Sequence, residues 1–207
     1  MLTELEADAG EAARALAGLL RDRFTCRAYL PDAVPRALIT KIAGIAQFTP
    51  SWCNTQPWKL YITEGETTRR FATELYAHAA SGARPETDFP FPARYDGVYD
   101  TRRRECAAQL YGSLGIAMGD RASSLRQTLE NFRLFDAPHV AIVTTAPELG
   151  AYGAVDCGLY VSNFLLAARA FGIATTPQAA LASYAPLVRA QLGIPEDRWI
   201  VCGISFG

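Results

Sequence analysis

The sequence predicts a single α+β domain in which a few strands are wrapped by many helices. Several segments repeat apolar residues at the spacing of an amphipathic helix, whereas only three short runs alternate or cluster apolar residues as strands do. The chain of 207 residues is half hydrophobic, which is enough for one large core. No repeat, low-complexity tract or linker interrupts residues 1–207, so we expect one domain.

The N-terminal segment is predicted to be a helix from Thr3 to about Arg21. Its apolar residues return at helical spacing: Leu5, Ala9, Ala12, Ala13, Leu16, Leu19 and Leu20. Residues 23–29 then read Arg-Phe-Thr-Cys-Arg-Ala-Tyr. In extended backbone alternate side chains share a face, so Arg23, Thr25 and Arg27 would form a compact anion site. A solvated edge strand is the other interpretation, and it is the commoner place for isolated alternating charges.

A second helix is expected to begin at Pro35, a residue that suits the first helical turn. It leads into a loop from Pro50 to Trp58, because Pro57 pushes Gln56 out of the helical region. Short polar side chains and two tryptophans in this loop would suit a flat ligand rich in heteroatoms. The alternative is a plain connection in which Trp58 is anchored in the core.

Residues 58–63 alternate as a strand, and Thr67 to about Ala80 follows as a helix. Residues 81–99 are rich in proline, glycine and aromatic side chains. A loop of this length without secondary structure is usually functional or mobile. We expect this segment to be either a flap over a pocket or surface padding.

The next elements are helices from Asp100 to Met118 and from Arg121 to Phe132, and a strand from His139 to Thr145. The first of these helices opens with three consecutive arginines, residues 102–104, which suit an acidic ligand or, more commonly, a solvated face. Its glycines do not form a Gly-x-Gly-x-x-Gly turn after a strand. The sequence therefore carries no dinucleotide-binding fingerprint of that type.

The most apolar helix is predicted from Tyr152 to Phe171, and Gly172 ends it. Residues 175–180 are expected to form a loop of small residues whose backbone can approach a ligand. Ser183 is expected to cap a short helix that ends at Leu192 and is closed by Gly193. Residues 199–206 form the last predicted strand.

Composition excludes several classes of protein. The net charge of −1 gives no reason to expect a nucleic-acid or membrane partner. Five dispersed cysteines without a Cys-x-x-Cys pair, and only two histidines, argue against a disulfide framework, a metal site or a serine hydrolase. The N-terminus is acidic, unlike a signal peptide, and no apolar run approaches the ~20 residues of a membrane span. A reducing, cytoplasmic location fits these features best.

Three separated segments resemble the FMN-dependent nitroreductase-like flavoproteins. They are residues 23–29, residues 50–58, and Asp156-Cys157-Gly158 running through Asn163 to Gly172. The resemblance continues at residues 177–180 and 192–195 and spans nearly the whole chain in the family's order. Residues around Arg103, Tyr111 and Asn131 are similar to the branch that contains nitrobenzoate and related nitroaromatic reductases.

This resemblance implies a small, mainly antiparallel sheet surrounded by helices in an intertwined homodimer, with FMN bound by both subunits. The cofactor would be bound by three groups of residues: Arg23, Thr25 and Arg27 at the phosphate and ribityl end; Pro50, Ser51, Asn54 and Gln56 from the partner subunit; and Pro177, Gln178, Ala179 and Ala180 along the flavin. A backbone N–H near Ala179 and Ala180 would face flavin N5, and no side-chain acid or base is required. The substrate pocket would include Trp52, Phe91 and Tyr95.

The implied activity is ping-pong electron transfer from NAD(P)H to a nitroaromatic or quinone-like acceptor. A flavin oxidase, dehydrogenase or dehalogenase of the same fold is one alternative, and a non-catalytic flavin-binding protein is another. A helical interaction domain without flavin is the third. Two features depart from the family pattern: Trp52-Cys53 replaces small residues, and Gln178-Ala179-Ala180 replaces a Glu-Gly sequence.

Overall fold

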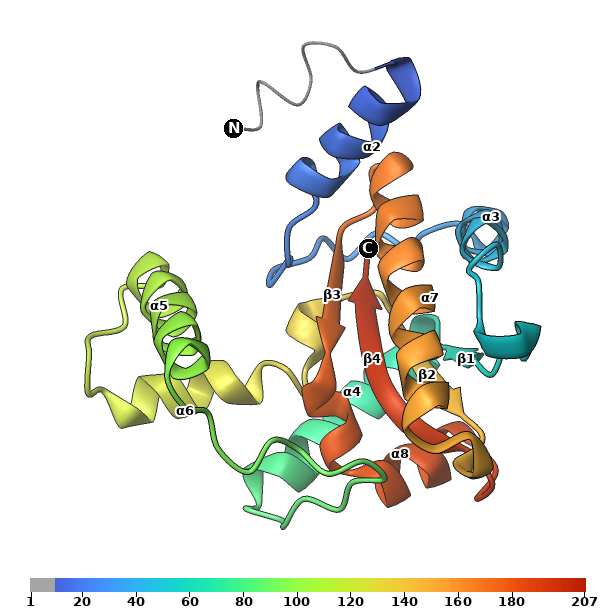
Figure 1. Cartoon of the computed structure of the whole chain (residues 1–207). Helices are drawn as coiled ribbons and strands as arrows, with labels where there is room; N and C mark the ends of the chain where they lie inside the picture. The colour runs from blue at the N-terminus through green and yellow to red at the C-terminus, as the bar shows by residue number, and fades with distance from the viewer. Residues whose placement is uncertain (1–9) are drawn as a thin grey trace.

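A four-stranded antiparallel sheet forms the centre of the molecule. The computed structural model describes residues 10–207 (Figure 1). The strands are β1 (Lys59–Ile62), β2 (His139–Thr145), β3 (Thr175–Gln178) and β4 (Trp199–Phe206), and their order in the sheet is β1-β2-β4-β3. All three neighbouring pairs are antiparallel. The predicted α+β class and mainly antiparallel sheet are confirmed.

Helices cover both faces of this sheet. The helices of the described residues are α2 (Glu11–Asp22), α3 (Arg36–Ala46), α4 (Gly65–Ala80), α5 (Val98–Ser113), α6 (Arg121–Leu129), α7 (Gly150–Ala170) and α8 (Ala185–Leu192). The start of the helix predicted from Thr3 lies outside the described residues, and α2 is the part that the structure describes. Pro35 precedes α3 as its N-cap residue instead of lying in its first turn.

Two apolar clusters, one on each face of the sheet, form the core. On one face, α3 and α7 pack on alternate residues of the central strands, and Ala141, Val143 and Ile204 lie in this cluster. On the other face, α4 and α8 pack on Val140 and Ile142. Every residue of β2 is buried. Burial on both faces explains why this strand is a continuous apolar run with no alternation.

Strand β3 corrects the loop predicted for residues 175–180. Residues 175–178 pair with β4, and a 3₁₀ turn, η4 (Ala179–Ser183), follows. The backbone N–H and C=O groups of Ala174 both bond to Gly207. Hydrogen-bonded and non-hydrogen-bonded pairs alternate along an antiparallel ladder, so the backbone polar atoms of Thr175 and Pro177 point away from β4. Because the backbone nitrogen of Pro177 faces the open edge of the sheet, its missing N–H breaks no ladder bond.

The predicted cap at Ser183 is wrong. Tyr184 is the N-cap residue of α8 and makes no side-chain cap bond, while Ser183 ends the preceding 3₁₀ turn. The carbonyl of Ser183 instead accepts a hydrogen bond from the N–H of Glu86 at 2.8 Å. Gly193 closes α8 with φ of 62°, as predicted for a glycine in the left-handed region.

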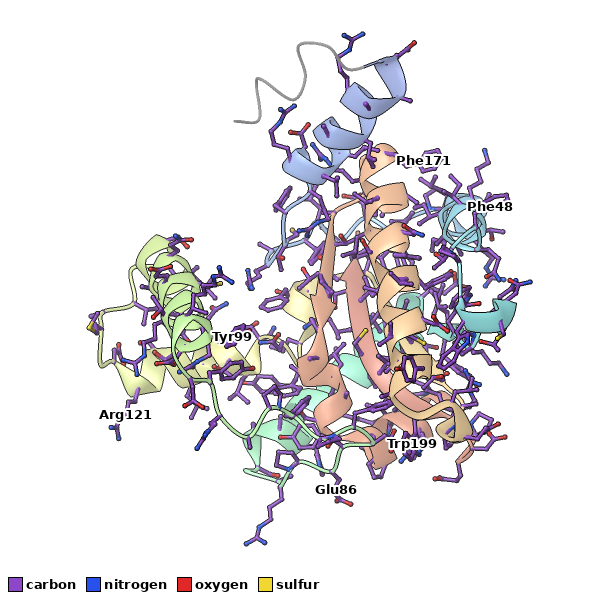
Figure 2. The ribbon with its side chains drawn as sticks, in the orientation of Figure 1. Phe48, Glu86, Tyr99, Arg121, Phe171 and Trp199 are labelled. Carbon is purple, nitrogen blue, oxygen red and sulfur yellow. The ribbon has the colours of Figure 1, made fainter. Side chains whose placement is uncertain are left out.

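Residues 81–99 have an anchored first part and an exposed second part. Glu86 pairs with the chain at Tyr184, and Phe89 packs edge-to-face on Trp199 with ring centroids 5.2 Å apart. Asp88 accepts hydrogen bonds from Arg189 at 2.6 Å and from the N–H of Ile200 at 2.7 Å. Residues 90–99, in contrast, are all exposed. Figure 2 shows Glu86 below the sheet and Tyr99 on α5, away from the body of the molecule.

The buried cysteine Cys157 gives a test of the core. Burial raises the pKa of its thiol from an ordinary 9.0 to about 12, so the folded protein keeps it protonated. Above about pH 9 the unfolded thiol ionises while the folded one does not, and stability is lost as the pH rises towards 12. At pH 8 we expect a thiol reagent to label exposed Cys106 rapidly and Cys157 only after unfolding, as mass spectrometry would show. Rapid labelling of Cys157 in the folded protein would contradict this core.

Candidate functional site

The segment at residues 23–29 runs beside the open edge of β3. Thr25 forms a parallel bridge with Thr175, and the N–H of Cys26 donates to the carbonyl of Thr175 at 3.2 Å. The hydroxyl of Thr176 donates to the carbonyl of Cys26. The Tyr29 hydroxyl lies 2.8 Å from Thr176 Oγ1 and 3.0 Å from the Ser205 carbonyl oxygen. Burial raises the pKa of Tyr29, so this hydroxyl stays neutral and can donate.

The predicted extended backbone places Arg23, Thr25 and Arg27 at alternate positions of this segment. Arg23 and Thr25 are half-buried and Arg27 is exposed, while the intervening Cys26 is buried. The Arg27 guanidinium lies 5.9 Å from the centroid of the Phe135 ring. Within residues 10–207, neither Arg23 nor Arg27 forms an ion pair with a carboxylate. Two cations next to a strand edge suit an anionic ligand.

The end of β3 directs backbone groups towards the same edge. The carbonyl of Gln178 faces β4, so the N–H of Ala179 across the same trans peptide points the opposite way, to the open edge. In a 3₁₀ turn, each N–H bonds to the carbonyl oxygen three residues before it, so the first N–H groups of the turn have no partner within it. Ala179 and Ala180 begin such a turn. These groups can donate to a ligand that lies along β3.

The loop from Pro50 to Trp58 is held by its own polar groups. The N–H of Gln56 donates to Ser51 Oγ at 2.9 Å, and Gln56 Nε2 donates to Asn54 Oδ1 at 2.9 Å. Cys53, Asn54 and Gln56 have φ values of 50°, 54° and 45°. Such strain persists only where surrounding contacts impose it, and it concentrates at functional sites.

Asp156 on α7 supports this loop, a role that was not predicted from the sequence. Its carboxylate is buried, and both oxygens lie 3.2–3.3 Å from the N–H of Trp52, the first residue of the 3₁₀ turn η1 (Trp52–Asn54). The available signal was an acidic residue on an otherwise apolar helix. Trp58 is buried and packs on Tyr160 with ring centroids 5.0 Å apart, so the loop is also anchored in the core as the alternative interpretation required.

The structure brings together two of the three predicted groups of site residues. Thr25 and Cys26 contact Thr175 and Thr176 of β3, directly before residues 177–180, whereas the loop at residues 50–58 leads into β1 at the opposite edge of the sheet. Three strand spacings, roughly 14 Å, separate β1 from β3. In Figure 1, helix α7 runs alongside β4, between the two regions. Within one chain, these groups therefore do not surround the same ligand.

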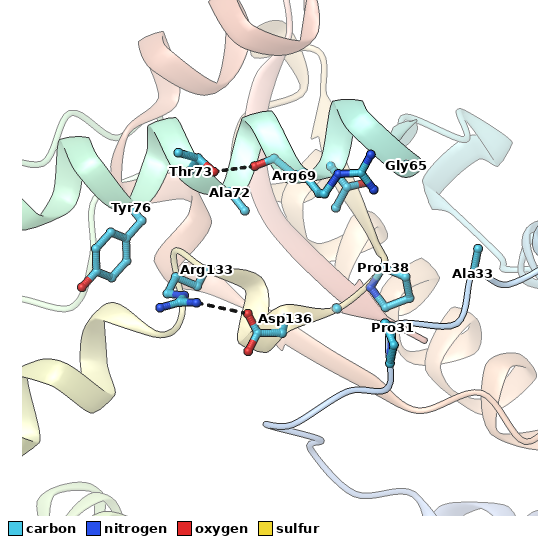
Figure 3. Close-up of a pocket in the computed structure, with 12 residues that line it drawn as sticks. Pro31, Ala33, Gly65, Arg69, Ala72, Thr73, Tyr76, Arg133, Asp136 and Pro138 are labelled. Atoms are coloured by element: carbon cyan, nitrogen blue, oxygen red, sulfur yellow. Dashed lines mark hydrogen bonds and ion pairs between the residues drawn. The ribbon is translucent and has the colours of Figure 1, made fainter.

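The predicted pocket residues lie at separate places. Trp52 lines a cavity of about 320 Å³ with Tyr152 and Asp156. Phe91 and Tyr95 are exposed, and Tyr95 lies under the Arg103 guanidinium at 5.4 Å. A second cavity, of about 550 Å³, lies between α4 and residues 133–138 and includes Tyr76 and Arg133 (Figure 3). No predicted site residue lines this second cavity.

The two histidines have structural contacts. The N–H of Val34 donates to Nε2 of His139, and Nδ1 of His139 lies 2.9 Å from the carbonyl oxygen of Thr63, so His139 joins β2 to two neighbouring segments. His78 packs edge-to-face on Tyr184. Over residues 10–207, no group of three or more His, Cys, Asp or Glu side chains could hold a metal ion. None of the helices in that range is long and apolar enough to cross a membrane.

The fold is α+β, and the segment that carries Arg23 and Arg27 lies beside its edge strand β3. The model of the nitroreductase family matches residues 20–207. The chain belongs to the nitroreductase family.

Named relatives share most of the chain. Nitroreductase NfnB of Mycolicibacterium smegmatis is 38% identical over 199 residues, which are 95% of this chain and 84% of that protein. Chloronitrobenzene nitroreductase of Comamonas testosteroni is 35% identical over 91% of this chain and 84% of that protein. The crystal structure of the FMN-dependent nitroreductase NfnB from Mycobacterium smegmatis in complex with NADPH superposes with a TM-score of 0.90 at 37% identity, covering 95% of this chain and 88% of that one.

Proposed function

We propose that this protein is an FMN-dependent oxidoreductase that transfers electrons from NAD(P)H to nitroaromatic or quinone-like acceptors. The observation that carries the proposal is the pair of arginines without carboxylate partners, Arg23 and Arg27, beside a strand end whose N–H groups face outward. The similar proteins support it, since one is an FMN-dependent nitroreductase crystallised with NADPH and another a chloronitrobenzene nitroreductase.

The residues at the β3 edge fit FMN. Arg23 and Arg27 supply the charge-assisted hydrogen bonds that a phosphate requires, and Thr25 adds a hydroxyl between them. The N–H groups near Ala179 and Ala180 would stabilise electron density on the isoalloxazine without titrating. When bound, FMN supplies the hydride and electron transfer that no side chain of this chain can provide. The protein's part is to bind the cofactor, orient it and leave one face open to the two substrates in turn.

A second copy of the chain would complete the site. In this proposal, Pro50, Ser51 and Asn54 of the loop at the far sheet edge approach the flavin of the partner subunit, and Gln56 supports them. An exposed apolar stripe on α7, formed by Tyr152, Val155 and Leu159, supports an intertwined homodimer because these residues recur at helical spacing. Phe48, at the end of α3, is 88% exposed and projects from the molecule in Figure 2. Large exposed apolar patches mark protein interfaces.

Val155→Glu is expected to weaken this dimer, because it would place a charge within the apolar stripe. Analytical ultracentrifugation should show wild-type dimers and a concentration-dependent monomer fraction in the variant. Glu105→Lys on the exposed face of α5 is the control for a changed surface charge. A wild-type chain that remains monomeric at micromolar concentration would refute the proposed dimer.

We also propose that residues 90–97 act as a flap. Their continuous exposure beyond the anchored Asp88 and Phe89 supports this role. Phe91 and Tyr95 on the flap, with Trp52, would then line the substrate pocket. The free cysteines are compatible with the cytoplasm as the location we propose.

An absorbance spectrum of the purified protein, before and after anaerobic NADPH, tests the function. Flavin bands that bleach, and that return on addition of nitrobenzene, are expected. Bands that persist with both NADPH and NADH would instead favour a flavin-binding protein without turnover. A colourless protein that does not bind added FMN would refute the proposal.

A further inference from the structure

We propose that the side chain of Gln178 is a positioning residue that holds the end of β3 in register with the flavin, with Ser205 and Asn131 as its partners. This inference rests on the proposed function, because it concerns the strand end that would face FMN. The family resemblance implies that residues 177–180 lie along the flavin. The residue Gln178 is only 3% exposed, and its side chain is hydrogen-bonded inside the protein.

Chemistry fixes the orientation of this carboxamide. Gln178 Nε2 lies 2.9 Å from the backbone carbonyl oxygen of Asn131, a group that can only accept, so this nitrogen must donate there. Asn131 Oδ1, at 3.3 Å, is a second acceptor for Nε2. Gln178 Oε1 then accepts from the Ser205 hydroxyl. Both ends of the carboxamide have partners on neighbouring elements, as a fully satisfied buried network requires.

The network reaches the arginine side of the site through an unusual turn. The Asn131 carbonyl also accepts from the N–H of Leu134 at 3.2 Å. Leu134, Phe135 and Asp136 have φ values of 61°, 53° and 62°, a left-handed run that Leu134 and Phe135 do not favour. The buried ring of Phe135 is the surface on which the Arg27 guanidinium lies.

One carboxamide therefore joins the two halves of the proposed cofactor site. On one side, it holds Gln178 itself, and the peptide group between Gln178 and Ala179 sets the direction of the Ala179 N–H. On the other side, it donates to the Asn131 carbonyl, which also accepts from the turn that places Phe135 next to Arg27. Loss of this carboxamide would free both halves to move relative to each other, so it should alter the redox equilibrium of the flavin as well as its affinity.

The test compares Gln178→Met with the wild type after loading with FMN. Methionine is similar in length and apolar, so it keeps the volume and removes all three hydrogen bonds of the carboxamide. We expect weaker FMN binding in a fluorescence titration. We also expect about a tenfold change in the ratio of oxidised to reduced flavin at fixed potential, about 30 mV for a two-electron couple. If Gln178→Met does not fold, Ser205→Ala is the second variant. It removes the hydroxyl that donates to Gln178 Oε1 and should shift the ratio of oxidised to reduced flavin in the same direction as Gln178→Met.

A matched control separates positioning from general stability. Thr68→Val removes the buried hydrogen bond between Thr63 and Thr68, of 2.7 Å, which lies between β1 and α4 and not at the β3 edge. It should lower the stability of the apoprotein but leave the flavin potential unchanged. An equal potential shift in Thr68→Val would mean that any loss of stability has this effect, and would overturn the proposal.

Gln178→Glu provides a pH-dependent readout. A carboxylate at this position would face the two acceptor oxygens of Asn131, whereas a protonated carboxyl can donate one hydrogen bond to them. The potential of the variant should therefore approach that of the wild type as the pH falls. A wild-type potential in both Gln178 variants at every pH would refute the positioning role, while bleaching of the flavin by NADPH would still support the proposed function.

Discussion

An Asp88→Ala variant is expected to lose about 3–5 kcal/mol of unfolding free energy, because it leaves the buried guanidinium of Arg189 without its main counter-charge. Both side chains of this pair are only 10% exposed, and Arg189 Nη1 lies 2.6 Å from Asp88 Oδ2. Asp88 also accepts from the N–H of Ile200, which would lose its partner. Glu196 lies 3.3 Å from Arg189 Nε and is largely exposed, so it offsets a small part of the loss.

Urea unfolding of the apoprotein measures the change, and an Asp88→Asn variant separates charge from hydrogen bonding. Asparagine keeps an oxygen that can accept from both Arg189 and the N–H of Ile200, so the loss of unfolding free energy should be smaller than in Asp88→Ala. Combining Asp88→Leu with Arg189→Met removes both charges and should recover much of the stability. An Asp88→Ala protein that unfolds at the same urea concentration as the wild type would show that this pair does not anchor residues 81–99. Limited proteolysis should also cut the variant faster at residues 90–97, where the anchored part of the segment ends.

Strand prediction was most accurate in the centre of the sheet. The predicted limits of β2 and β4, residues 139–145 and 199–206, match the structure because each strand contains a run of apolar residues, and β2 is buried along its whole length. Strand β3 was missed for the opposite reason. It has four residues, one of them proline, and pairs on one side only along most of its length. Propensity and periodicity carry little signal for such an edge strand.

Helix limits were least accurate where a helix has no buried face. Helix α5 was predicted to reach Met118, but it ends at Ser113, and Gly115 adopts φ of 68° just beyond it. None of the residues of α5 is buried, so its sequence has no apolar stripe to mark where the helix leaves the core. Asp120 caps α6 by accepting from the N–H of Ser123, a signal that the sequence analysis did not use.

The site was only partly predictable, because its parts meet through tertiary structure. Alternation predicted that Arg23, Thr25 and Arg27 share one face that could bind an anion, and the sequence between Pro177 and Ala180 suggested close backbone approach. That these segments pair with each other, through residues such as Cys26 and Thr176 that are 150 positions apart, follows only from the folded sheet. The buried roles of Gln178, Asp156 and Asp88 were not predicted, since a polar residue in a sequence does not show whether its partner is solvent or protein.

Replacing both arginines, as Arg23→Ala with Arg27→Ala, is expected to raise the dissociation constant for FMN by about 10²–10⁴-fold. Each charge-assisted hydrogen bond to a phosphate contributes about 1.5–3 kcal/mol. Within the described residues, neither guanidinium group already forms an ion pair with a carboxylate. Arg23→Ala alone should give a smaller loss. Isothermal titration of the apoprotein with FMN measures the affinity directly. Riboflavin, which lacks the phosphate, should bind the wild type and the double variant almost equally.

Thermal or urea unfolding gives an independent measure, because FMN that binds only the folded state stabilises it by an amount that rises with the logarithm of its affinity. At a free FMN concentration a hundredfold above the wild-type dissociation constant, the wild type should gain about 2.7 kcal/mol. A hundredfold weaker double variant should gain only about 0.4 kcal/mol at the same concentration. Arg70→Ala with Arg84→Ala removes two exposed guanidinium groups elsewhere and serves as the control for net charge. If this control loses as much FMN affinity as the double variant, the arginines act through long-range charge. If the double variant keeps wild-type affinity for FMN, the phosphate is bound elsewhere and the assignment of the β3 edge must be abandoned.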